Sequence, residues 1–193
     1  MISRRDILSC ADPIRTNYLE HFIQLHESGR LASVLLIIHY NYGIPYILFT
    51  KRSSSLTSHA GEVCFPGGKF VKGDKALYFT ALRETKEEVG LDFKKKDICG
   101  SLEAVRTVTS DYIITPYITV QDKIPKPRLL LDEVQKILDV PLLDVLNTVT
   151  PDKERGILPR KDRFKFRYNK EVIWGASARI LKQLYDRLFT TYY

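Results

Sequence analysis

The stretch GEVCFPGGKFVKGDKALYFTALRETKEEVGL runs from Gly61 to Leu91 and changes character halfway along. Its first part is rich in glycine and proline, whereas its second part carries apolar residues at helical spacing. Gly90 is of the residue type favoured just past a helix C-terminus, so the pattern predicts a helix from Ala76 to Val89. A loop therefore leads directly into an acidic helix.

Three glutamates of this helix are predicted to share one side. At about 3.6 residues per turn, Glu84, Glu87 and Glu88 fall within roughly a third of the circumference. Like charges at i and i+4 repel by about 0.2–0.5 kcal/mol even in water, and a bound divalent cation would reverse that cost. Glu84 and Glu88 are therefore candidate metal ligands, with Glu87 as a third ligand or a proton acceptor. The alternative is a solvated acidic face that binds nothing.

The residues around the glutamates suggest supporting roles. Arg83 is spaced to pair with Glu87 at i,i+4 and would hold that carboxylate, or it merely balances the charge of the helix. Gly67 and Gly68 would let backbone N–H groups approach phosphate oxygens, or they only shape the turn. Asp74 is expected to cap the N-terminus of the helix instead of binding metal.

Loop and helix together resemble the signature of the Nudix hydrolases, which cut nucleoside diphosphates linked to another group. The matching residues are Gly68, Asp74, Arg83-Glu84, Glu87-Glu88, Gly90 and Leu91. Two departures are visible: aspartate stands at position 74 where the signature usually has glutamate, and one extra residue precedes Arg83. In both departures the sequence resembles the branch of the family that hydrolyses coenzyme A.

A second, upstream motif resembles the same branch. It reads LFTKRSSSL over residues 48–56, followed by Gly61, Val63, Phe65, Pro66, Gly67 and Gly68. The resemblance implies that Arg52, Ser53 and Leu56 contribute to coenzyme A recognition. Arg52 would bind a phosphate, the alternative being a surface charge at a strand end. The motif departs at Thr57, where the branch often has arginine, which puts the contact of that arginine in doubt.

The resemblance implies metal-dependent hydrolysis of the diphosphate of coenzyme A, or of its acyl and oxidised derivatives. The products would be 3′,5′-ADP and a 4′-phosphopantetheine compound, and the cofactor Mg²⁺ or Mn²⁺. Arg83, Glu87 and Glu88 would form the catalytic set, with Glu87 or Glu88 as the base. Two alternatives stay open: a Nudix hydrolase for another substrate, such as NADH, ADP-ribose or capped RNA, and a catalytically inactive nucleotide-binding module.

Composition narrows the class of partner. The 193 residues, 44% hydrophobic and 27% charged, fit one soluble globular domain. The net charge of +7 favours anionic partners, namely nucleotides, phosphorylated cofactors, nucleic acid or a membrane surface, and no aromatic-interleaved motif supports single-stranded RNA. If residues 163–168 form an alternating strand, Arg163, Lys165 and Arg167 share a face that could hold phosphates or simply meet solvent.

The remaining patterns concern compartment and membranes. Three cysteines without a CxxC pair predict neither a disulfide framework nor a zinc site. We therefore expect an intracellular protein, cytoplasmic or mitochondrial, and the C-terminus carries no peroxisomal signal. The longest apolar run, Leu31 to Ile38, is too short to span a bilayer. A homodimer is left open.

Periodicity predicts a mixed β-sheet core with flanking α-helices. The resemblance implies the Nudix fold, an α+β fold in which such a sheet is sandwiched between α-helices, as a single domain from residue 1 to 193. Residues 1–30 would form a helical extension, with a helix at 12–27, and residues 171–190 a C-terminal helix. Strands are expected at 32–40 and 46–51 around the turn Asn41-Tyr42-Gly43, and at 99–108 and 112–120. A short helix is expected at 142–147 after Pro141.

Overall fold

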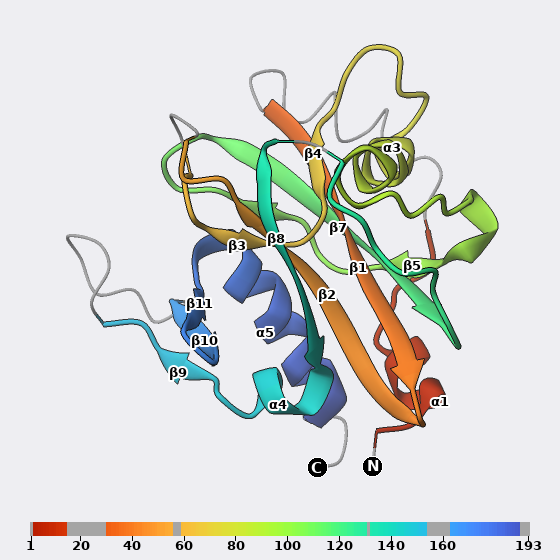
Figure 1. The fold of residues 1–193 in the computed structure, drawn as a ribbon, viewed down its shortest axis with the longest axis vertical. Coiled ribbons are helices and arrows are strands. Elements are labelled where there is room, and N and C mark those ends of the chain that lie inside the picture. The colour runs from red at the N-terminus through yellow and green to blue at the C-terminus, as the bar shows by residue number, and fades with distance from the viewer. Residues whose placement is uncertain (1, 15–29, 56–58, 131, 154–162, 190–193) are drawn as a thin grey trace.

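A mixed β-sheet forms the centre of the molecule (Figure 1). The computed structural model describes residues 2–14, 30–55, 59–130, 132–153 and 163–189. In the middle of the sheet, β1 (Arg30–Asn41) pairs antiparallel with β2 (Ile44–Arg52) and parallel with β7 (Tyr112–Gln121). The sheet is therefore mixed, as predicted.

Shorter strands extend this centre. Two strands pair with β2, namely β3 (Val63–Cys64) and β8 (Val134–Pro141). The strand β4 (Gly67–Lys69) pairs with β1. Two strands pair with β7, namely β5 (Ile98–Ser101) and β6 (Val105–Arg106). Within the described residues these make an eight-stranded sheet. A smaller sheet consists of β9 (Thr150–Pro151), β10 (Phe164–Tyr168) and β11 (Glu171–Ile173).

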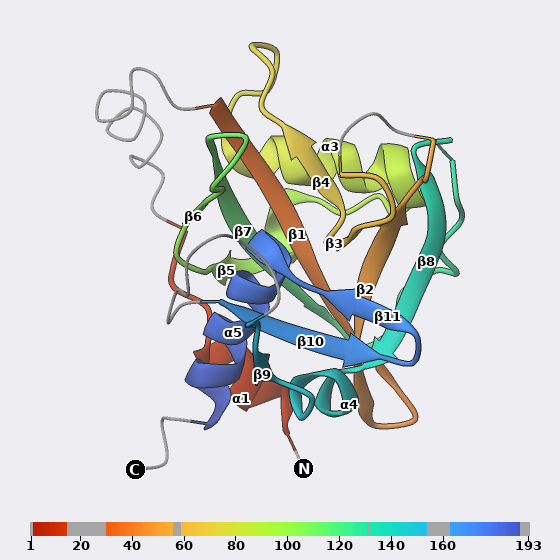
Figure 2. The same cartoon turned by 90° about the vertical axis from the view of Figure 1, so that its left-hand side faces the viewer.

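Helices cover both faces of the central sheet (Figures 1 and 2). One face carries α3 (Leu77–Val89), and the 3₁₀ turn η1 (Lys95–Asp97) follows it in the chain. The other face carries α1 (Arg4–Ser9), α4 (Leu142–Leu146), α5 (Gly175–Phe189) and the smaller sheet. The predicted sandwich of a sheet between helices is confirmed.

The apolar run in β1 explains these layers. Successive side chains of a strand point to opposite faces, and a sheet buried on both faces reads as a continuous apolar run. Leu35 and Ile37 belong to the apolar cluster under α3, whereas Leu36 and Ile38 belong to the cluster under α5. One stretch of sequence therefore supplies both cores.

The predicted β1–β2 hairpin is confirmed, and its turn chemistry is clear. Tyr42 and Gly43 have φ values of 48° and 78°, and Asn41 pairs with Ile44 across the turn. Two consecutive residues with positive φ form a type I′ turn, whose twist matches that of the flanking strands. The short helix after Pro141 is also confirmed as α4.

The elements that were not predicted include α1 and β8. The helix α1 begins with a capping box in which Ser3 and Asp6 bond each other's backbone N–H, a signal readable in the sequence. The strand β8 lacks a clear alternation, because its register with β2 shifts between Lys51 and Arg52. A register shift breaks the period of two on which strand prediction depends.

At the C-terminus the predicted helix over 171–190 is partly wrong. Residues Glu171–Ile173 form β11 by pairing with β10, and α5 begins only at Gly175. At the N-terminus, most of the predicted helix at 12–27 lies outside the described residues. Asp12 itself forms a bridge with Ser101 of β5.

The predicted basic face of residues 163–168 is also wrong. Arg167 is exposed, but only 7% of Lys165 is exposed, and its ammonium lies 3.9 Å from the buried carboxylate of Asp152. The strand has β9 on one side and β11 on the other, so Lys165 is covered by neighbouring structure. The two cations are therefore not a common phosphate-binding surface.

No helix in the described part of the chain is long and apolar enough to cross a bilayer.

The three cysteines differ in environment, which predicts their reactivity. Burial raises the pKa of Cys10 and of Cys64 to about 11, whereas Cys99 is exposed. Because the thiolate is the reactive form, we expect one fast equivalent of reaction with a disulfide reagent in the native protein and the rest only after unfolding. Absorbance at the reagent's chromophore measures this, and Cys99→Ser should remove the fast phase. Two fast thiols in the wild type would contradict the fold described.

Candidate active site

Strand β1 holds the loop that precedes α3. The backbone N–H of Leu35 donates to the carbonyl of Pro66 at 2.8 Å, and that of Phe70 donates to Leu31 at 2.9 Å. The buried hydroxyl of Ser33 donates to the carbonyl of Leu77 at 2.6 Å, which ties the first turn of α3 to the same strand. The loop and the helix are therefore fixed to the central sheet at both ends of the loop.

Gly67 and Gly68 fill positions that leave no room for a side chain. Gly67 has φ 154°, and a Cβ there would overlap the carbonyl oxygen of Ser33 and lie 2.6 Å from Cα of Val34. A Cβ on Gly68 would overlap the carboxylate of Glu84. The first glycine thus allows close approach to β1, and the second allows close approach to the acidic side of α3.

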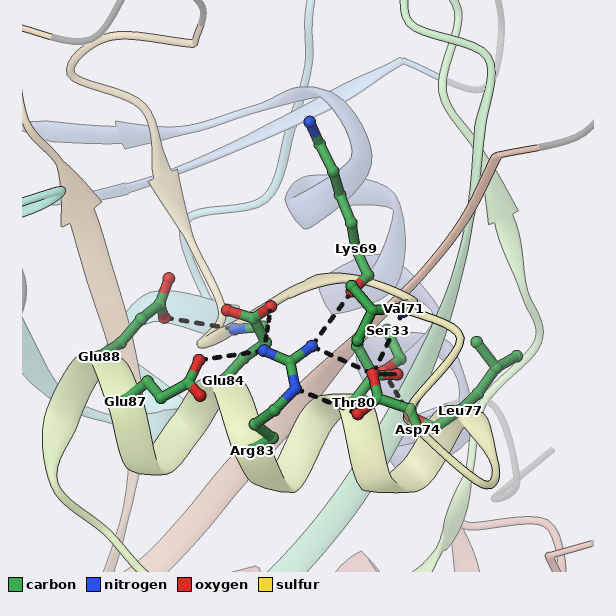
Figure 3. Close-up of polar contacts among 11 residues, drawn as sticks. Ser33, Lys69, Val71, Asp74, Leu77, Thr80, Arg83, Glu84, Glu87 and Glu88 are labelled. Carbon is green, nitrogen blue, oxygen red and sulfur yellow. Dashed lines mark hydrogen bonds and ion pairs between the residues drawn. The ribbon is translucent and has the colours of Figure 1, made fainter.

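Arg83 is the centre of a network of polar contacts (Figure 3). Its Nε and one terminal nitrogen each donate to Asp74 at 3.1 Å, and that terminal nitrogen also donates to the carbonyl of Lys69 at 3.3 Å. The other terminal nitrogen donates to Glu84 at 2.9 Å and to Glu87 at 3.0 Å. The predicted pairing of Arg83 with Glu87 is confirmed, and it is one contact of a larger set.

The expectation that Asp74 caps the helix is wrong. Ala76 is the N-cap, and no side chain caps the helix there. Asp74 instead accepts hydrogen bonds from the backbone N–H of Val71 at 3.3 Å, from the hydroxyl of Thr80 at 2.8 Å and from Arg83. Burial acts to raise the pKa of Asp74, but the hydrogen bonds from Arg83 and Thr80 outweigh it and lower the pKa. Asp74 fixes the guanidinium.

We expect Arg83→Met to lower the free energy of unfolding by about 2 kcal/mol, because a largely buried carboxylate at Asp74 loses its partner. The side chain of Asp74 is 7% exposed and that of Arg83 is 30% exposed, so solvent screens only part of this pair. Urea unfolding measures the change. Lys94→Met removes a well-exposed pair with Asp92 and should change stability by less than about 0.5 kcal/mol. Equal losses of stability from the two substitutions would contradict the view that Arg83 compensates a largely buried carboxylate at Asp74.

The three glutamates lie in different environments. Glu88 is 4% exposed, and its carboxylate accepts a hydrogen bond from the backbone N–H of Gly67 at 3.3 Å. Burial raises the pKa of Glu88 to about 8, and the charge of Glu84 adds to the rise. Burial also raises the pKa of Glu84, whereas the side chain of Glu87 is 47% exposed. Glu84 and Glu88 thus face the glycine loop, and Glu87 faces solvent.

The donor set fits a hard divalent cation. Glu84 and Glu88 offer carboxylate oxygens beside backbone of the glycine loop, and a buried carboxylate such as Glu88 is costly unless a positive charge accompanies it. In the part of the chain that the structure describes, no three acidic, histidine or cysteine side chains are gathered closely enough to hold a metal ion. Glu84 and Glu87 are instead both bound by the same terminal nitrogen of Arg83.

The upstream motif reaches the same site. The positive charge of Arg52, at the end of β2, acts on Glu88 and opposes the rise of its pKa. Buried Nε of Arg52 has no hydrogen-bond partner in the described residues. Ser53 lies next to it, with its hydroxyl 2.8 Å from that of Ser55, whereas Leu56 and Thr57 are outside the described residues. The charge of Arg52 therefore acts on Glu88, although these two sequence-predicted residues are far apart in the chain.

Two contributors were missed at the sequence level. Ser33, which anchors α3, is a polar residue inside an apolar strand, and this pattern was a usable signal. Glu133, whose charge also raises the pKa of Glu88, accepts a hydrogen bond through its carbonyl from the N–H of Ser53 at 2.8 Å. Nothing in the local sequence around Glu133 indicated this position, because it depends on the pairing of β8 with β2.

A protein-family model described as NUDIX domain matches residues 29–160. This match covers more than half of the chain and includes the glycine loop and all of α3. The chain belongs to the Nudix family. Among its relatives, an uncharacterized Nudix hydrolase named NudL from Photorhabdus laumondii is 36% identical over 169 residues, which cover 83% of this chain and 86% of the relative. Nudix hydrolase 3 of Caenorhabditis elegans is 32% identical over 175 residues, covering 81% of this chain and 72% of the relative.

Solved structures agree with the fold of this Nudix domain. A MutT/nudix family protein from Enterococcus faecalis aligns with a TM-score of 0.57 at 13% identity, covering 99% of this chain and 74% of the other. A NUDIX hydrolase from Alicyclobacillus acidocaldarius aligns with a TM-score of 0.53 at 19% identity, covering 62% of this chain and 82% of the other. These structures support the fold class of this Nudix domain, and the site must be argued from its own residues.

Proposed function

We propose that this Nudix domain is a metal-dependent coenzyme A diphosphatase. The observation that carries the proposal is the meeting of two sequence motifs at one place: the glycine loop lies against Glu84 and Glu88, and the charge of Arg52 acts on Glu88. An acidic pair beside an arginine provides a place for a cation and for a phosphate. Hydrolysis of the diphosphate of coenzyme A needs both a bound cation and a group that holds a phosphate.

Glu84 and Glu88 would hold Mg²⁺ or Mn²⁺, with Glu87 as third ligand or as the base. The cation would neutralise phosphate charge and lower the pKa of a bound water. Arg83 would position the carboxylates of Glu84 and Glu87, both of which it already contacts. Arg52, with Ser53 and Leu56, would bind the substrate, and the backbone of Gly67 and Gly68 would lie beside its phosphates.

The reaction itself is a hydrolysis. The oxygen of water forms a bond to one phosphorus of the diphosphate, the bridging P–O bond breaks, and the released proton passes to Glu87 or Glu88. The products are 3′,5′-ADP and 4′-phosphopantetheine, or an acyl-phosphopantetheine. Because the side chain of Glu87 is half exposed, it would accept that proton at the solvent side of the site.

A second candidate is a Nudix hydrolase for another nucleoside diphosphate derivative, such as NADH, ADP-ribose or capped RNA. A solved NUDIX domain of Shewanella oneidensis NrtR, complexed with ADP ribose, has a TM-score of 0.52 at 20% identity, covering 69% of this chain and 87% of the other. That likeness concerns the fold. The residues that separate the two candidates are Arg52 and Ser53 of the upstream motif.

Product analysis by mass spectrometry tests the proposal. The purified protein is incubated with Mg²⁺ or Mn²⁺ and a mixture of coenzyme A, acetyl-coenzyme A, NADH, ADP-ribose and capped RNA. We expect 3′,5′-ADP to appear with metal and not with a chelator. Release of AMP from NADH or ADP-ribose in preference would overturn the coenzyme A assignment, and no turnover of any substrate would favour a nucleotide-binding module.

A further inference from the structure

A depression lies on the side of α3 that faces away from Glu84 and Glu88. Its volume is about 450 Å³, within the size range of small-molecule sites. It lies between α3 and the segment that leads into η1, and Phe79, Leu82, Arg83 and Lys86 line it from the helix. Glu84 and Glu88 are absent from its lining. At about 100° per residue, these two glutamates lie roughly opposite Phe79 and Lys86.

The depression is strongly basic. Five cations and two carboxylates line it, namely Lys75, Arg83, Lys86, Lys94, Lys95, Asp74 and Asp92. Asp92 is shared by Lys86 and Lys94 at 3.1 and 2.9 Å. Among the residues that the structure describes, Lys75 and Lys95 have no carboxylate partner. Two ammonium groups are therefore available to an anion that enters the depression.

Aromatic rings accompany these charges. Phe79 is 36% exposed, and its ring packs against that of Tyr78 with centroids 4.5 Å apart. Phe93 lines the depression from the other side, and the ammonium of Lys95 lies 5.3 Å from the centroid of Tyr78. An exposed aromatic ring beside cations without a carboxylate partner suits a ligand that has a flat ring and an anionic group. The flat ring stacks on the aromatic side chain, and the anionic group pairs with the cations.

We propose that this depression is a binding site for a nucleoside monophosphate on the opposite side of α3 from Glu84 and Glu88. The phosphate pairs with Lys75 and Lys95, and the base stacks on Phe79. A mononucleotide carries both the base and the phosphate that these groups would bind, and the depression has the size of a small-molecule site. Arg83 and Asp74 line this depression and also connect to the glutamates, so the occupant lies next to the residues that hold the acidic site.

Calorimetric titration with AMP tests the site in the full-length protein with a chelator, so that no cation attracts phosphate to the acidic side. We expect Lys95→Glu to weaken AMP binding by about tenfold, because a repulsive charge replaces a pairing one. Lys96→Glu is the matched control, since Lys96 is an exposed neighbour outside the lining. It should change affinity by less than about twofold. Equal weakening by both variants, or no AMP binding by the wild type, would overturn the proposal.

Two further titrations are informative. One separates the contribution of base stacking from that of charge, and the other separates the depression from the acidic site as the place where AMP binds. Phe79→Ala should weaken AMP binding by about tenfold and leave inorganic phosphate binding unchanged, and an equal loss of both ligands would overturn the stacking assignment. Glu84→Gln/Glu88→Gln should leave AMP binding intact in chelator, and its loss would assign the nucleotide to the acidic site. Hydrolysis of coenzyme A is measured separately, so AMP binding without turnover would refute only the proposed activity.

Discussion

Glu88→Gln should lower hydrolysis of coenzyme A by about 10³-fold, while the fold persists. The substitution keeps the size of the side chain and removes the charge that would hold the cation. Because burial raises the pKa of Glu88 to about 8, its carboxyl is largely neutral near pH 7 without metal, so a neutral amide of the same size should not lower the melting temperature of the metal-free protein. Steady-state turnover at saturating Mg²⁺ measures the activity, and thermal unfolding measures the fold.

The matched control for this prediction is Glu103→Gln. The side chain of Glu103 is 80% exposed and lies outside the acidic helix, so the same chemical change should leave turnover within about twofold. Unchanged turnover in Glu88→Gln would refute the assignment of Glu88 to the metal site. A large loss in both variants would point to a general effect of charge.

Gly67→Ala should lower the free energy of unfolding by about 3 kcal/mol or more. The added Cβ meets backbone of β1, at the carbonyl oxygen of Ser33 and at Cα of Val34, and neither can move without breaking the pairing of β4 with β1. The φ of 154° adds strain for any residue other than glycine. Chemical unfolding of the metal-free protein measures the loss.

Gly68→Ala is the companion variant, and it should act on activity more than on stability. The three atoms nearest to the added Cβ all belong to the carboxylate of Glu84, the far end of a side chain that can turn away. We expect stability to fall by less than about 1 kcal/mol and turnover to fall by about tenfold or more. Equal destabilisation by the two alanines would contradict the description of the loop.

The acidic helix could be predicted because its signals are local. Its bounds follow from helical spacing and from Gly90, which adopts the left-handed conformation with φ 71°. The pairing of Arg83 with Glu87 follows from i,i+4 spacing alone. The same local reasoning failed at Asp74, because three donors from the loop and the helix compete for its carboxylate and only the folded chain brings them together.

Long-range pairing sets the limit of prediction elsewhere in the site. The burial of Lys165 depends on Asp152 and on strands at both sides of β10, which no periodicity of residues 163–168 could indicate. The effect of the Arg52 charge on Glu88 likewise depends on long-range pairing, because the end of β2 is held by β3 and β8. The upstream motif predicted a role for Arg52 in recognition, which stays a prediction, and the charge of Arg52 acts on Glu88.

Binding of Mn²⁺, followed by electron paramagnetic resonance, is the most direct test that the acidic side of α3 is a metal site. Free Mn²⁺ gives a strong signal that binding removes. We expect the wild type to remove the signal and Glu84→Gln/Glu88→Gln to leave it intact at the same protein concentration, with a melting temperature no lower than that of the metal-free wild type. Equal binding of Mn²⁺ by both proteins would contradict a metal site at Glu84 and Glu88.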